Sequence, residues 1–77
     1  MAFVTTYFVN VILEVAGKKE EVRGPERDSE EEAKADLAEL RESLGNGEWI
    51  NLNWISANPK SVAAAVLDSE TTGFEII

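Results

Sequence analysis

An alternating pattern of apolar residues occupies the start of the chain and predicts a long β-strand from Phe3 to Val15. Most odd-numbered positions of this segment are apolar, and the even-numbered positions add Val4, Phe8 and Ile12. β-Branched and aromatic residues favour strands, and successive side chains of a strand point to opposite faces of a sheet. The predicted strand therefore carries apolar side chains on both of its faces.

A hairpin is expected to follow this strand. Ala16-Gly17-Lys18-Lys19 supplies the turn, because Gly17 can adopt positive φ at no steric cost. Glu20 to Arg23 then returns antiparallel as a short strand. Gly24-Pro25 ends the pairing, since proline has no backbone N–H to donate to a neighbouring strand.

A helix from about residue 29 to residue 44 is the clearest element of the sequence. Asp28 or Ser29 can cap its N-terminus, and the acidic residues that follow suit the positive end of the helix dipole. Apolar residues recur at steps of four, three and four, which places on one face Ala33, Leu37, Leu40 and Leu44. Gly45 is expected to end the helix in a left-handed conformation.

Three more strand-like segments are expected after the helix. Trp49 to Ser56 alternates as one strand, and Asn58-Pro59 breaks it. Ser61 to Asp68 is expected as the next strand, although its three central alanines are also compatible with a helix. Thr72 to Ile77 is expected to add a short edge strand.

The two tryptophans are predicted to have different roles. Trp54 shares the phase of Ile50 and Leu52 in the predicted strand and is therefore expected in the core. Trp49 shares the phase of two asparagines, so it either anchors an interface or packs on the second face of the sheet.

The predicted fold is a single α+β domain over residues 1–77, in the order ββαβββ, with an antiparallel sheet of four to five strands and one helix packed on one face. A chain of 77 residues is too short to support two hydrophobic cores. One helix covers only part of one sheet face. The uncovered apolar face is therefore a candidate interface, which predicts a homodimer through Val4, Phe8, Ile12 and Ile55.

Acidic residues dominate the charge of the chain and gather in one segment. The chain has 15 Asp and Glu residues against 7 Lys and Arg residues, a net charge of −8. Residues 26–48 hold nine acids and three bases, so this segment alone contributes −6. Such a surface repels nucleic-acid backbones and anionic membranes, and it favours a partner protein with a basic surface.

The residue types most often used in catalysis are missing. The chain has no histidine and no cysteine, which removes the commonest general base and the usual zinc ligands. Lys60-Ser61 is the only close pair of a base and a hydroxyl nucleophile, and adjacent side chains of a strand point apart. The protein is therefore expected not to be an enzyme and to use no metal or cofactor. No stretch approaches the roughly 20 consecutive apolar residues that span a bilayer, and the cytoplasm is the expected location.

The leading hypothesis is a small acidic protein that docks on a basic surface of a partner protein, steered by its helix carboxylates. The predicted partner-binding residues are Glu30, Glu31, Asp36, Glu39, Glu42 and Trp49. In its sharpest form the protein is an inhibitor from a virus or mobile element, which mimics nucleic acid by placing carboxylates where phosphates would lie. The alternative hypothesis is a homo-oligomeric structural or ligand-sequestering protein that works through the uncovered apolar sheet face.

Overall fold

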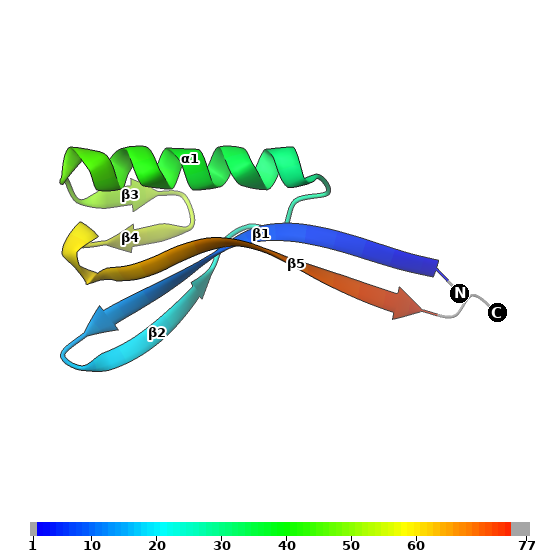
Figure 1. The fold of residues 1–77 in the computed structure, drawn as a ribbon, viewed down its shortest axis with the longest axis horizontal. Coiled ribbons are helices and arrows are strands. Elements are labelled where there is room, and N and C mark those ends of the chain that lie inside the picture. Colours follow the sequence, from blue (N-terminus) through cyan, green and yellow to red (C-terminus); the bar gives the residue numbers. More distant parts are fainter. Residues whose placement is uncertain (1, 75–77) are drawn as a thin grey trace.

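One helix and a three-stranded antiparallel sheet form the main part of the molecule (Figure 1). A computed structural model describes residues 2–74 of the chain, and the strands of this sheet are in the order β2-β1-β5. The elements are β1 (Ala2–Val15), β2 (Lys18–Arg23), α1 (Glu30–Asn46), β3 (Ile50–Leu52), β4 (Ile55–Ala57), a 3₁₀ turn η1 (Pro59–Ser61) and β5 (Val62–Phe74). The predicted α+β class is confirmed. The prediction that all strands belong to one sheet is wrong, because β3 and β4 form a separate two-stranded sheet.

The hairpin between β1 and β2 is tighter than the sequence suggested. Its turn consists of Ala16 and Gly17 alone, both with positive φ, of 52° and 80°. Positive φ at both central residues is typical of the two-residue hairpin turn whose twist matches that of the flanking strands. Val15 is therefore paired directly with Lys18, and β2 begins two residues earlier than predicted.

The segment that follows β2 stays hydrogen-bonded to β1. The Gly24 N–H donates to the Val9 carbonyl at 2.7 Å, and Tyr7 and Arg27 exchange backbone hydrogen bonds of 2.9 and 2.7 Å. A Cβ atom on Gly24 would lie only 3.1 Å from the Val9 carbonyl oxygen and 3.5 Å from the Trp54 ring. A larger residue here would push on its neighbours, so the close approach of the backbone favours glycine at this position.

The helix begins where the sequence predicts and ends later. The Ser29 side chain accepts a hydrogen bond from the Glu32 N–H at 3.3 Å and donates to the Glu32 carboxylate at 3.1 Å. This arrangement is a variant of the capping box in which the carboxylate accepts from the Ser29 hydroxyl instead of the Ser29 backbone N–H. Gly47, with φ of 67°, adopts the left-handed conformation, and its N–H donates to the Leu44 carbonyl. The prediction that Gly45 has this role is wrong, because Gly45 and Asn46 remain helical.

The segment predicted as one strand from Trp49 to Ser56 is a hairpin. A turn at Asn53 and Trp54 reverses the chain, so that Leu52 is paired with Ile55 and Ile50 with Ala57. Paired residues of two antiparallel strands share one face, and the turn therefore moves Ile55 to the same side as Ile50. A continuous strand would have placed these two residues on opposite faces.

The last two predicted strands are one element. β5 runs from Val62 to Phe74 without a break, and its alanine-rich beginning is extended. A register shift between Ile12 and Leu13, which are paired with Ala64 and Val62, leaves Ala63 as a bulge. Residues 75–77, at the end of the predicted fifth strand, lie outside the described part of the chain.

The hydrophobic core lies between α1, one face of the sheet and the β3–β4 hairpin. Odd-numbered residues of β1 face the helix, and the cluster consists of Val9, Val11, Leu13, Leu37, Leu40, Ile50, Ile55 and Ala57. Trp54 is half-buried beside this cluster rather than within it.

Beyond the core, β1 and β5 continue together as a two-stranded projection that extends past the start of α1 (Figure 1). We call the four residue pairs from Ala2↔Phe74 to Thr5↔Thr71 the arm. The longest dimension of the molecule is 50 Å, against 26 and 17 Å for the others. The fold therefore combines a packed body with a narrow extension at one end.

Candidate binding site

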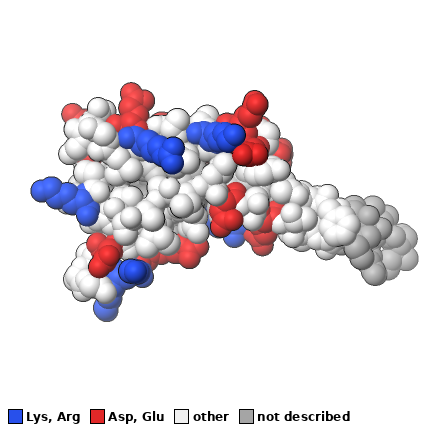
Figure 2. Space-filling view, in the orientation of Figure 1, with Lys and Arg blue, Asp and Glu red and all other residues white. Residues whose placement is uncertain are grey.

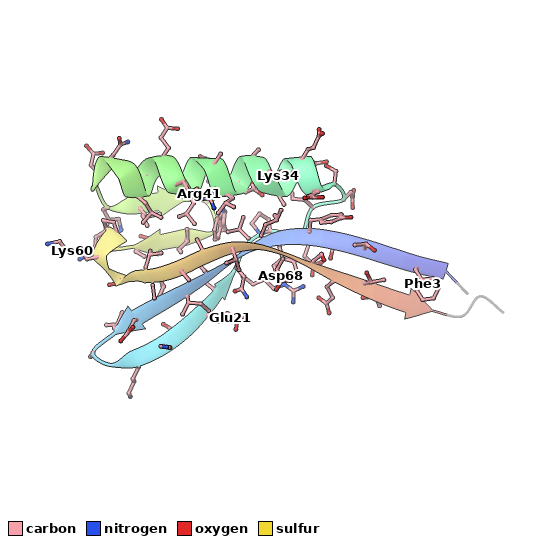
Figure 3. All side chains as sticks on the ribbon, in the orientation of Figure 1. Phe3, Glu21, Lys34, Arg41, Lys60 and Asp68 are labelled. Atoms are coloured by element: carbon pink, nitrogen blue, oxygen red, sulfur yellow. The ribbon has the colours of Figure 1, made fainter. Side chains whose placement is uncertain are left out.

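The two basic residues of the helix lie on one of its flanks. Lys34 and Arg41 are seven residues apart, which is close to two helical turns, so they share one flank of α1. Glu32 and Glu39 have the same spacing and lie on the nearly opposite flank. Figure 3 shows Lys34 and Arg41 along the flank in view, and Figure 2 shows basic side chains on that side of α1. The two bases of α1 are thus confined to the flank opposite Glu32 and Glu39.

The acidic flank consists of Glu32, Asp36 and Glu39, spaced by four and three residues. Asp36 is buried and receives two hydrogen bonds from the Arg27 guanidinium, from Nε to Oδ2 at 2.8 Å and from Nη2 to Oδ1 at 3.1 Å. These hydrogen bonds and the charge of Asp36 raise the pKa of Arg27, and Glu32 adds to the effect. A buried carboxylate requires such a partner. The inner part of the acidic flank is therefore neutralised.

A hollow of about 320 Å³ lies beside the acidic flank. It lies between α1, the β3–β4 hairpin and the segment that follows β2, and it is lined by Pro25, Arg27, Asp36, Glu39, Asn51, Leu52, Asn53 and Trp54. The lining combines an aromatic ring, one carboxylate without a salt bridge in the described structure, and two amide side chains. A cationic side chain could interact with all of these groups, whereas no histidine, cysteine, serine or threonine lines the hollow to act as a nucleophile.

The five predicted partner-binding residues of α1 occupy four kinds of position. Glu39 lies at the hollow, while Glu31 and Glu42 are exposed on the outer side of the helix. Glu30 is paired with Lys34 at 3.3 Å on the basic flank. Asp36 is buried in its ion pair and is not exposed for docking as the hypothesis required.

Trp54 lies outside the core in which it was expected, whereas Trp49 is exposed and its predicted role at an interface stays a prediction. The Trp49 side chain is 61% exposed, and its indole N–H donates to the Ser56 hydroxyl at 2.9 Å on the outer side of the hairpin. It does not line the hollow that the described residues form. Trp54 does line it, because the turn at Asn53 and Trp54 moves this residue out of the strand.

The sheet face opposite the helix holds three of the four predicted interface residues. Val4, Phe8 and Ile12 alternate on it, but the Arg23 guanidinium lies 3.8 Å above the Phe8 ring and buries it. Arg23 is held there by salt bridges to Glu26, at 3.1 Å, and to Glu70. Glu70 and the other neighbouring carboxylates raise the pKa of Arg23.

Ile55, the fourth predicted interface residue, lies in the core and not on this face. The polar residues of the sheet also cover part of the same face. Asn10 donates through Nδ2 to Glu21 at 2.8 Å, and the side chains of Glu21 and Asp68 lie on the side of the sheet away from α1 (Figure 3). This face is therefore less apolar than the sequence suggested.

Within residues 2–74, no group of three or more acidic side chains is arranged to hold a metal ion. The described part of the chain also contains no helix with the length and apolar character needed to cross a membrane. No family model, curated protein or solved structure matches this chain. The geometry of the acidic flank and the hollow is therefore the only guide to function.

Proposed function

We propose that the protein is a non-catalytic binding protein that docks on a basic surface of a partner protein. The observation that supports this most strongly is the position of the two bases of α1, which lie on the side away from the hollow, while the acidic flank lies beside it. A lysine or arginine side chain of the partner enters the hollow, where it meets the Glu39 carboxylate and the face of Trp54.

Each group of the hollow has a distinct part in this binding. Arg27 neutralises Asp36, so the charge that attracts the partner lies at Glu39 and, further along the same flank, at Glu32. The Asn51 and Asn53 amide oxygens are available as further acceptors for N–H donors. The net charge of −8 accelerates the encounter with a basic surface at low ionic strength.

Mimicry of nucleic acid is a narrower form of this proposal. A mimic must present carboxylates along the whole surface that enters a nucleic-acid groove, and Lys34 and Arg41 limit the acidic surface to one side of the helix. Competition between this protein and duplex DNA or RNA for the captured partner would test that form directly.

Two charge-matched pairs of substitutions test the proposal. Glu32→Gln with Glu39→Gln neutralises the acidic flank, and glutamine still completes the capping box at Glu32. Glu31→Gln with Glu42→Gln removes the same charge from the outer side of α1. The wild-type chain is expected to capture basic proteins from a lysate of its host at low salt. The first pair should abolish this capture, and the second should weaken it only slightly.

Equal losses for the two pairs would contradict the proposal, because they would mean that net charge alone drives capture. Capture that persists unchanged at 1 M salt would also contradict it, since charge attraction between exposed groups is largely screened there.

A further inference from the structure

The arm consists of two paired strands with exposed apolar side chains on both faces. Phe3, at its end in Figure 3, is 67% exposed on the helix side, and Val4 is 47% exposed on the other side. Its two strands contact each other through the Phe3 ring over Gly73 and a 2.9 Å hydrogen bond between the Thr5 and Thr71 hydroxyls. A two-stranded ribbon without a further layer is only marginally stable in water.

The arm is also free of charge. None of the 22 charged residues lies in the segments 2–5 or 71–74. Figure 2 shows the described part of the arm without an acidic or basic side chain on the face in view. Exposed strand edges are usually protected from pairing by charged residues, proline or a covering element. Within residues 2–74 the arm has no such protection.

The backbone of β5 has a free edge along the arm. Tyr7, Val9 and, by alternation, the other odd-numbered residues of β1 direct their backbone groups toward β2 and the segment after it. The even-numbered residues of β1 therefore bond to the even-numbered residues of β5. Ser69, Thr71 and Gly73 consequently direct their N–H and C=O groups away from β1, where no described strand pairs with them.

We infer that two copies of the protein associate through their arms, with the β5 edge of one copy antiparallel to the β5 edge of the other. A two-fold axis near Thr72 pairs Thr71 of one copy with Gly73 of the other, and both residues have free backbone groups. Glu70 is then opposite Phe74, so no carboxylate faces a carboxylate. Each arm becomes part of a four-stranded sheet.

The distribution of charge on the chain allows a second copy to bind at this edge. Two bodies that each carry −8 repel each other, so a stable contact between copies requires the part of the surface without charge. The arm meets this requirement, and its position at one end of a 50 Å molecule keeps the two bodies apart. The uncovered sheet face, by contrast, carries Glu21 and Asp68 and is partly closed by Arg23.

Two proline variants test this inference, and they differ only in the edge that they block. Thr71→Pro removes an N–H from the free edge of β5, and Thr5→Pro removes an N–H from the opposite edge of the arm. Neither N–H takes part in the β1–β5 ladder, and both variants lose the same hydroxyl hydrogen bond. Sedimentation equilibrium of the purified full chain between about 1 µM and 1 mM measures the oligomeric state, and circular dichroism verifies that each variant is folded.

The wild-type chain and Thr5→Pro are expected to form dimers as the concentration rises, and the apparent dissociation constant of Thr71→Pro should be at least tenfold weaker. A wild-type chain that stays monomeric at 1 mM would overturn the inference. Loss of dimers in Thr5→Pro with retention in Thr71→Pro would also overturn it, because the contact would then use the β1 edge. The test needs no partner protein, so its failure is distinct from failure of the proposed function.

Discussion

Truncation of Ile55 tests the hairpin that places Trp54 at the hollow. The Ile55 side chain is 6% exposed and packs in the core, whereas a continuous strand from Trp49 to Ser56 would leave it on the other face. Replacing a buried isoleucine with alanine costs about 2–5 kcal/mol of unfolding free energy, through lost burial and the cavity that remains. A chain of this length has a total stability of only about 4–12 kcal/mol, so the loss is a large fraction.

Val66→Ala is the matched control for Ile55→Ala. Val66 is 50% exposed on the sheet face away from the helix, and its truncation should cost about 1 kcal/mol or less. Urea unfolding followed by circular dichroism and tryptophan fluorescence measures both free energies, and the melting temperature of Ile55→Ala should fall by roughly 10 °C or more. If Ile55→Ala proved no more destabilising than Val66→Ala, the hairpin and the position of the hollow would both be wrong.

Three further changes test the ends of the helix and the cover of the sheet. Gly47→Ala should lower the unfolding free energy by about 1 kcal/mol because Gly47 has a positive φ, whereas Gly45→Ala should raise it by up to about 1 kcal/mol because Gly45 is helical. Changes of the same sign for both variants in urea titrations would show that the helix does not end at Gly47. Ser29→Ala should cost about 1 kcal/mol in the same assay through loss of the N-cap, and an unchanged midpoint would contradict the capping box. Arg23→Ala should uncover the Phe8 ring and increase binding of a hydrophobic dye to the folded protein, and unchanged dye fluorescence would show that another group covers this ring.

Sequence patterns predicted the elements that depend on contacts between residues close together in the chain. The long first strand, the hairpin and the helix follow from alternation, a glycine turn and an apolar stripe, and all three are present. The hairpin at Asn53 and Trp54 was missed because alternation continues into it and neither residue is a glycine or proline. The helix end was placed two residues too early because Gly45 and Gly47 are both glycines that suit a left-handed helix end, and spacing alone does not choose between them.

The candidate site was less accessible from sequence because it depends on contacts between distant elements. The spacing of Glu32, Asp36 and Glu39 could have revealed the acidic flank, since steps of four and three define one side of a helix. The pairing of Arg27 with Asp36 could not be predicted, because it depends on the path of the chain beside β1. The arm could not be predicted for a similar reason, because its extent depends on the register in which β1 pairs with β5.

The most direct test of the proposed function is a nuclear magnetic resonance titration with a short arginine-containing peptide. The two tryptophan indole N–H signals report on different surfaces, because Trp54 lines the hollow and Trp49 is bonded to Ser56 on the outer side of the hairpin. The Trp54 signal should shift and saturate as peptide is added, the Trp49 signal should stay nearly constant, and Glu39→Gln should weaken the response several-fold. Parallel, non-saturating shifts of both signals, or no shift of Trp54, would contradict the account.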